Sequence, residues 1–300
     1  MTRRRNLEHH RHSLAEIRNI MNSMKTLAYM ETRKLTRFLN AQHAVVESIE
    51  EVAADFLGFY PETLPESKNA RPVYLLIGTE RGFCGDFNHA LLKRLQSALP
   101  AHPSGSVMLI AVGRKLHALL EDNSYDANVA ALIDGASVAE EVTELLGRVV
   151  TELAALQDKQ GVLSVFCLHH GSDDGILIQK LLPPFEELLN EPPRFAFPPV
   201  MNQAPREFLL ELTDQHLFAA LHEMVYTSLM AENRQRMAHL EGAVQHLDDE
   251  STELARKINA LRQEEIIEEI EVILLSATRP EKKTERRAHV GMTGNNNDKQ

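Results

Sequence analysis

The chain has few cysteines, the residues on which disulfide-stabilised folds depend. Its 300 residues include two cysteines, Cys84 and Cys167, and no tryptophan. The cysteines lie far apart and outside a C-x-x-C spacing, which excludes a disulfide framework and a zinc knuckle and is typical of a reducing cytoplasm. The histidine runs at 9–12 and 169–170 have no convincing second set of ligands on one helix face, so the sequence predicts no metal site and no cofactor.

Long apolar runs and a basic charge balance are also absent. No apolar stretch approaches the roughly 18–20 residues that span a bilayer, and the N-terminus does not lead into the apolar core of a secretory signal. With 32 basic and 43 acidic residues the net charge is −11, the opposite of the basic footprint that binds nucleic acid. The sequence therefore predicts no direct membrane insertion and no nucleic-acid partner. Any role at a membrane would depend on partner proteins.

Two long segments contain almost no proline or glycine. Residues 7–59 have no proline and one glycine, Gly58, and residues 207–277 have no proline and one glycine, Gly242. Both carry apolar residues at alternating spacings of three and four, which over several heptads is typical of a coiled-coil helix. The seam predicted for the first segment is Leu14, Ile17, Met21, Met24, Ala28, Leu35, Phe38, Val45, Ile49, Val52 and Phe56, interrupted at Glu31 and Gln42.

Between these segments the pattern changes to alternating strands and helices. Continuous apolar runs of this length are typical of buried parallel strands. Their alternation with helical stretches predicts a doubly wound, Rossmann-like α/β domain with a mainly parallel sheet. The predicted strands are 73–78, 107–113, 129–133 and 163–169, and the predicted helices are 87–99, 114–120, 138–156 and 176–188.

Together these segments predict an antiparallel coiled coil with an α/β domain inserted between its two helices. The C-terminal helix is longer by about twenty residues, roughly 30 Å at 1.5 Å per residue, so its last turns should project past the N-terminal helix. The polar C-terminal segment has too few apolar residues to fold. The predicted divisions are a coiled-coil helix at 1–60, the α/β domain at 72–199, a second coiled-coil helix at 206–278 and a disordered tail at 279–300.

One turn in the α/β domain, IGTERGFCGDFN at residues 77–88, combines glycines with a cysteine. A phosphate loop needs G-x-x-x-x-G-K-[ST], but here Gly85 is followed by Asp86, whose carboxylate would repel phosphate. A nucleophilic Cys84 needs a lowered pKa and a base, and the nearest histidine along the chain is His89. The favoured interpretation is a strand-to-helix turn, made with glycine, that presents a surface to another protein.

Three separated stretches resemble the γ subunit, the central rotor shaft, of F-type ATP synthases. Their order on a helix–α/β–helix plan covers most of residues 1–278. Asp86, Ile267 and the chain beyond Ala277 depart from the family pattern, which indicates a divergent branch such as the alternate or N-type ATPases. The stretches are IMNSMKTLAYMETRK from Ile20, ERGFCG from Glu80 with Asn88, and LRQ from Leu261 with Ile266 and Glu269.

The resemblance implies a non-catalytic subunit that couples ion transport, such as hydrogen ion transport, to ATP synthesis or hydrolysis in a ring of α and β subunits. Its other implied partners are the ε subunit and the c-ring, at the cytoplasmic face of the cell membrane. The residues implied to contact β are Arg262, Gln263, Glu269, Arg81, Gly82, Cys84 and Gly85. Those implied to form a sliding bearing are Ile266, Ile270, Ile273 and Leu274, and those implied in coiled-coil coupling are Met24, Arg33 and Lys34.

Two alternative functions stay open on the residues alone. One is an α/β enzyme or small-ligand domain with a coiled-coil dimerisation stalk, which needs polar catalytic groups at the carboxyl ends of the strands. The other is a scaffold coiled coil with no rotary role. The polar groups near the predicted strand ends form no recognisable catalytic constellation; they are Thr79, Glu80, Arg81, His169, His170, Asp173 and Asp174.

Overall fold

A computed structural model describes residues 2–64, 70–99, 107–122, 129–173, 175–190 and 194–277. The predicted tail at 279–300 lies outside these residues. The chain divides into two compact units: a domain unit, residues 17–247, and a helix-end unit formed by residues 1–16 and 248–300. Two long helices, α1 (Thr2–Leu57) and α5 (Pro205–Ala277), contribute to both units.

The domain unit contains a five-stranded sheet in the order β3-β2-β1-β4-β5. The pairs β3–β2, β2–β1 and β1–β4 are parallel, and β4–β5 is antiparallel, so the predicted mainly parallel, doubly wound sheet is confirmed. The strands are β1 (Arg71–Ile77), β2 (Met108–Val112), β3 (Val129–Ile133), β4 (Leu163–His170) and β5 (Ile176–Leu182). The remaining helices are η1 (Pro61–Thr63), α2 (Phe87–Ala98), α3 (Arg114–Asp122), η4 (Ala139–Glu141), α4 (Val142–Gln160) and η5 (Glu186–Asn190).

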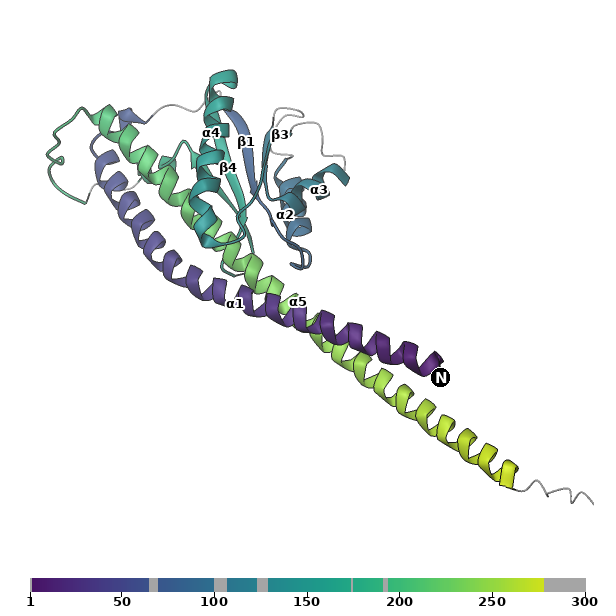
Figure 1. Ribbon diagram of the computed structural model, residues 1–300. Coiled ribbons are helices and arrows are strands. Elements are labelled where there is room, and N and C mark those ends of the chain that lie inside the picture. The colour runs from purple at the N-terminus through teal and green to yellow at the C-terminus, as the bar shows by residue number, and fades with distance from the viewer. Residues whose placement is uncertain are drawn as a thin grey trace, which may run out of the picture. The chain divides into compact units, whose positions relative to one another are not determined.

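Helices cover both faces of this sheet (Figure 1). Alternate residues of a strand point to opposite faces, and β1 follows this rule: Val73, Leu75 and Ile77 pack in one core while Tyr74 and Leu76 pack in the other. The first core is completed by α4 and by the middle of α5, and the second by α2 and α3. The C-terminal helix is therefore part of the α/β core as well as of the coiled coil.

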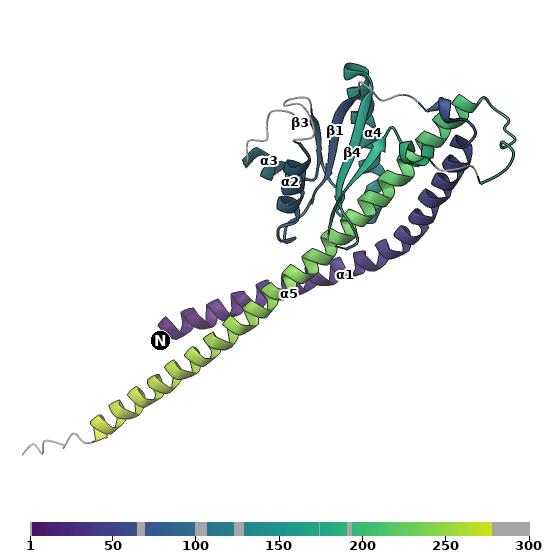
Figure 2. The ribbon, with the colours of Figure 1, turned by 180° about the vertical axis from the view of Figure 1, so that it is seen from behind.

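Within the domain unit α1 and α5 run antiparallel, as Figure 2 also shows from behind. Lys25 pairs with Glu241, and the His43 Nδ1 atom lies 2.8 Å from a carboxylate oxygen of Glu223. Farther along α1, the ring of Phe56 lies 4.9 Å, centroid to centroid, from that of Phe208 near the start of α5. The predicted antiparallel coiled coil is confirmed by these pairs.

The predicted seam of α1 is wrong at Ile17, which is 43% exposed, and along its second half. Phe38, Val45 and Val52 are 43–47% exposed, and the side chains directed inward at those turns are the next residues along the chain. Each of these three residues is followed directly by another apolar residue. The heptad pattern therefore fits either residue of each pair. The observed seam uses Leu39, Val46 and Ala53, and Leu35, Ile49 and Phe56 are kept as predicted.

The helix predicted at 176–188 is also wrong, because residues 176–182 form β5. A short connection returns the chain beside β4, and the Gly171 amide donates to the Gly175 carbonyl at 2.8 Å across it. Backbone pairing with β4 satisfies the donors and acceptors that a helix would have satisfied internally. Gly171 and Gly175 are typical of a hairpin connection between two strands. The apolar residues that follow them fit a helix as well as a strand, which led to the wrong prediction.

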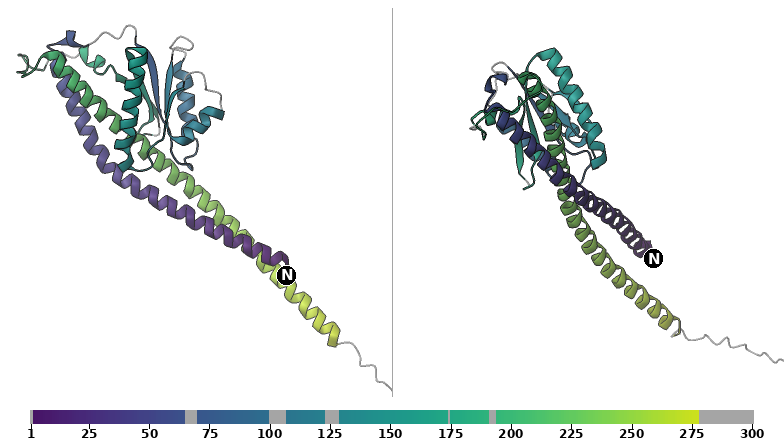
Figure 3. Two further views of the ribbon diagram at one scale, coloured as in Figure 1. Left: turned by 45° about the horizontal axis from the view of Figure 1, so that its top comes forward. Right: turned by 90° about the vertical axis from the view of Figure 1, so that its left-hand side faces the viewer.

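In the helix-end unit ion pairs link the first residues of α1 to the last part of α5, and the right-hand view of Figure 3 shows the two helices diverging toward the N-terminus of α1. His10 lies 3.2 Å from Glu250 and Arg4 lies 2.9 Å from Glu265, so this pairing is antiparallel too. The α5 helix continues for three further turns to Ala277. Among the described residues no helix combines the length and the apolar character needed to cross a membrane.

Candidate functional site at the opening loop and the helix tip

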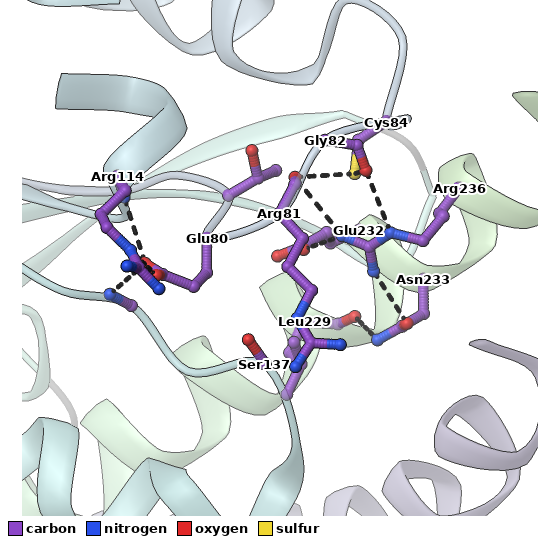
Figure 4. A network of polar contacts seen from close by, with 12 residues as sticks. Glu80, Arg81, Gly82, Cys84, Arg114, Ser137, Leu229, Glu232, Asn233 and Arg236 are labelled. Carbon is purple, nitrogen blue, oxygen red and sulfur yellow. Dashed lines mark hydrogen bonds and ion pairs between the residues drawn. The ribbon is translucent and has the colours of Figure 1, made fainter. Parts of the chain in front are cut away.

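The residues after β1, numbers 78–86, are named here the opening loop. Glu80 ties the start of this loop to the carboxyl ends of two other strands (Figure 4). Its carboxylate accepts hydrogen bonds from the backbone amides of Arg114, at 3.1 Å, and Gly135, at 2.8 Å, and pairs with the Arg114 guanidinium. Burial opposes ionisation of Glu80, but these donors outweigh it and lower the pKa of the carboxyl. Glu80 thereby fills the helix N-terminal position at which a ligand anion could have bound.

Gly113, at the end of β2, lets the chain pass close to the opening loop. Its φ of +104° is in the region that favours glycine, and a Cβ there would lie 2.6 Å from the Thr79 carbonyl oxygen. Thr79 is held in turn by Asn88 of α2, whose side-chain oxygen accepts from the Thr79 amide at 3.0 Å. Asn88 also donates its side-chain amide to the Thr79 hydroxyl at 2.9 Å. The base of the loop is therefore fixed by reciprocal bonds.

The point where the strand order reverses, between β1 and β4, is filled by the protein itself. Open α/β sheets bind ligands at such a point. Here the ring of Phe87 stacks on that of His170 with centroids 3.6 Å apart, and the His170 Nε2 atom lies 3.0 Å from the Phe87 carbonyl oxygen. His169 pairs with Gln179 at 2.7 Å, and burial lowers the pKa of its imidazole.

The polar groups expected of the alternative enzyme are thus mostly bonded inside the domain. Asp174, one of those groups, lies outside the described residues. The residues that the structure describes contain no group of three His, Cys, Asp or Glu side chains that could hold a metal ion. Among the described residues, this edge of the sheet carries a loop braced by its own polar groups.

Past Glu80 the opening loop exposes Arg81, Phe83, Gly85 and Asp86. Phe83 and Gly85 have φ values of 65° and 59°, and the Phe83 side chain is 47% exposed. A pocket of about 270 Å³ beside the loop is lined by Arg81, Lys115 and His239 among others. Asp86 is exposed and makes no side-chain cap bond at the start of α2. The loop surface combines basic groups with an exposed aromatic ring.

Cys84 points inward from this loop. Its thiol contacts the carbonyl oxygens of Gly82, at 3.4 Å, and Arg81, at 3.5 Å. Burial, together with the nearby negative charge of Glu232, raises the pKa of the Cys84 thiol to about 12. A nucleophile would need the opposite shift. Cys84 is therefore a packed thiol of the loop.

We expect iodoacetamide at pH 8 to alkylate Cys84 of the native chain at least about a hundredfold more slowly than free cysteine. A pKa of about 12 leaves little thiolate at that pH, and the side chain is 5% exposed. Mass spectrometry of timed samples measures the rate, and the chain unfolded in urea, in which both cysteines react, is the control. Fast alkylation of the native chain would contradict the inward placement.

On the other side of the opening loop lies a buried polar cluster of α5. Glu232, Asn233 and Arg236 are each at most 6% exposed. Arg236 donates from Nε to the Gly82 carbonyl at 3.2 Å and from Nη2 to the Arg81 carbonyl at 3.5 Å (Figure 4). The sequence pattern did not single out this cluster as a site. The signal that could have found it is the clustering of Glu232, Asn233 and Arg236 within about one turn of the helix, directly after the apolar residues Leu229, Met230 and Ala231.

The residues implied in coiled-coil coupling differ in their surroundings. Met24 is half-buried and Arg33 is exposed. Lys34 pairs with Glu31 of its own helix at 2.9 Å and with Glu140 of η4 at 2.7 Å. Glu31, which interrupts the predicted seam, is buried and accepts from the Ala139 amide at 2.7 Å. This break in the heptad is thus an attachment of α1 to the α/β domain.

The residues predicted for the tip all lie on the helix-end unit. Arg262, Gln263 and Glu269 are exposed on α5. The apolar side chains beyond the Arg4–Glu265 pair are exposed as well, from 46% for Ile266 to 72% for Leu275. The other large apolar side chains of this segment are Ile267, Ile270, Val272, Ile273 and Leu274.

An antiparallel helix pair carrying an inserted doubly wound domain defines a helical-stalk protein. The family model described as ATP synthase matches residues 3–278. The chain belongs to the ATP synthase family, as one of its γ chains. The resemblance found in the three sequence stretches is thereby confirmed.

Individual relatives agree with this assignment. The ATP synthase γ chain of Pelotomaculum thermopropionicum is 24% identical over 280 residues, covering 87% of this chain and 93% of the relative. That of Caldanaerobacter subterraneus subsp. tengcongensis is 21% identical over 291 residues, covering 89% and 96%. Among solved structures, a rotor chain of the Euglena gracilis mitochondrial ATP synthase has a TM-score of 0.56 at 16% identity, covering 88% of this chain and 99% of that one. A chain from the Tetrahymena thermophila central stalk and c-ring has a TM-score of 0.54 at 16% identity, covering 75% and 99%.

Proposed function

We propose that this chain is the rotating central stalk of an ATP synthase and makes or breaks no bonds itself. It turns inside a ring of α and β subunits, so that each β subunit meets a different side of the shaft. Its α/β domain is the foot that joins the ε subunit and the c-ring, at the cytoplasmic face of the membrane. Ion flow turns the shaft during ATP synthesis, and hydrolysis turns it in reverse.

The exposed apolar tip of α5 is the observation that carries this proposal. Beyond the Arg4–Glu265 pair, α5 continues for about 18 Å at 1.5 Å per residue and presents large apolar side chains to solvent. Contiguous exposed apolar surface on a soluble chain is typical of an interaction site. Apolar contacts have no directional bonds to break, so they suit a surface that slides within a collar.

The contact residues proposed for β fall into two sets, one in each unit. Arg262, Gln263 and Glu269 are exposed polar groups next to the apolar tip, and arginine can grip a carboxylate with two parallel bonds. The opening loop presents Arg81, with Gly82 and Gly85 forming the turn. Cys84 is buried, so its contribution to a β contact is to support the loop from within.

Co-expression with the α and β subunits of the same complex tests this function. We expect the chain to co-purify with three copies of each and to show no ATPase activity alone. The assembled ring should lose its coupling to ion flow when the chain is left out. ATP turnover by the isolated chain, or purification as a dimer with no α or β, would contradict the proposal and favour an enzyme with a dimerisation stalk.

A further inference from the structure

The buried cluster on α5 is unusual because it places charge inside a core. Removing an arginine and a glutamate from water costs more than their attraction returns unless further hydrogen bonds complete the pair. Arg236 Nη2 pairs with Glu232 one turn earlier, and Nη1 donates to the Asn233 side-chain oxygen at 3.0 Å. Asn233 is anchored in turn, since its amide donates to the Leu229 carbonyl at 2.9 Å. The guanidinium is therefore fixed by its own helix.

The remaining donors of this guanidinium reach another part of the chain. Nε and Nη2 point to the carbonyl oxygens of Gly82 and Arg81, which lie more than 150 residues earlier in the sequence. These are the same two oxygens that the Cys84 thiol contacts. Arginine has a planar fork with five donors, so one side chain can bind the helix and the loop together.

We propose that Arg236 is a positioning residue that clamps the opening loop to α5, so that the turning shaft carries the loop with it. This inference rests on the proposed rotary function. Glu80 braces the loop against the sheet, and Arg236 braces it against the shaft. The two braces hold the backbone at Arg81 and directly before Phe83, so that both side chains are presented in a fixed orientation. A loop braced only at Glu80 could change its orientation relative to α5 beyond that residue and so lose its register with β.

The loop can be tested in the isolated full chain, because Cys84 reports its opening. We expect Arg236→Gln to speed alkylation of Cys84 by on the order of tenfold, the change expected when charge-assisted bonds to the loop are lost. Cys167, which is fully buried in the other core, should stay protected. Arg234→Gln is the matched control, since Arg234 is exposed two residues away and donates to Ser172 instead. Unchanged Cys84 labelling in a folded Arg236→Gln chain would overturn the clamp.

A second measurement uses the assembled complex. Arg236→Gln should lower ATP synthesis several-fold while ATP hydrolysis is retained, and Arg236→Lys, which keeps the charge but not the fork, should lie between it and the wild type. The Arg234→Gln complex should synthesise ATP as the wild type does. If Arg236→Gln speeds Cys84 labelling but the complex still synthesises ATP at the wild-type rate, the positioning role is overturned. The assignment of the chain as a γ subunit would not be affected. Failure of the wild-type chain to assemble with α and β would instead overturn the proposed function.

A double variant that leaves no unpaired buried charge controls for the possibility that Arg236→Gln fails to fold. In Glu232→Gln/Arg236→Met both charges are removed and the volume is kept, so the helix should stay folded. Its far-UV circular dichroism and its protection of Cys167 should match the wild type, while Cys84 labelling should be as fast as in Arg236→Gln. Slow Cys84 labelling in this double variant would overturn the clamp even if the single variant fails to fold.

Discussion

Removal of residues 266–277 is expected to lower ATP synthesis by the assembled complex by at least about tenfold and to leave the chain folded. The apolar side chains of this segment are exposed in the chain by itself, so their removal should cost under about 1 kcal/mol of unfolding free energy. In the complex the same side chains are proposed to be the bearing. Measurement of synthesis and hydrolysis in reconstituted vesicles, beside thermal unfolding of the isolated chain, separates the two effects.

Two truncations distinguish the bearing from the polar contact beside it. A chain ending at Glu265 keeps Arg262, Gln263 and the Arg4–Glu265 pair, whereas a chain ending at Leu261 loses all three. We expect the shorter chain to be the more severely uncoupled. Within the full-length helix, Ile270→Ser/Ile273→Ser should reproduce part of the loss, and the neighbouring exposed change Glu271→Ala should have none. Full ATP synthesis by the chain ending at Leu261 would show that neither set of tip residues has the proposed role.

The sequence predicts the two long helices well because their signal is local and repeated. Proline-free stretches with a heptad pattern can bury their apolar stripe only in another helix or in a core. The register of α1 was harder, since Phe38–Leu39, Val45–Val46 and Val52–Ala53 each offer two adjacent apolar residues. A choice between them depends on where α5 lies, and a pattern of apolar residues along one helix does not contain that information.

The opening loop shows the same limit in a different form. Its glycines and the missing lysine were enough to exclude a phosphate loop from sequence. Its bracing was not predictable, because the donors to Glu80 come from Arg114 and Gly135, 34 and 55 residues away. Arg236 is more distant still. Contacts of this kind depend on how the sheet packs against α5. They produce no periodic pattern of apolar residues from which they could be predicted.

Replacing Glu80 with alanine is expected to lower the free energy of unfolding by about 2–4 kcal/mol, the cost of leaving two partly buried backbone amides without their acceptor. The amides belong to Arg114 and Gly135, and the Glu80 side chain between them is 3% exposed. Arg114→Ala distinguishes the contribution of the two amides from that of the ion pair. It removes the exposed guanidinium and keeps both backbone hydrogen bonds to Glu80. Its effect should be much smaller. Urea unfolding followed by far-UV circular dichroism measures both variants.

The contribution of Glu80 should also depend on pH in a defined direction. The pKa of its carboxyl is lowered in the folded chain from an ordinary value of 4.5, so folding favours the ionised form. The stabilisation is therefore fully present above about 4.5 and is lost as the pH falls through the lower folded-state pKa. The difference in unfolding free energy between the wild type and Glu80→Gln should be largest at pH 6.5 and should shrink toward pH 3. Asp86→Asn, which changes an exposed carboxylate of the same loop and leaves the Glu80 bonds in place, is the matched control. If the difference in unfolding free energy between the wild type and Glu80→Gln stayed constant from pH 6.5 to pH 3, the negative charge of Glu80 would not contribute to holding the opening loop. Its shape and hydrogen bonds alone would then hold the loop.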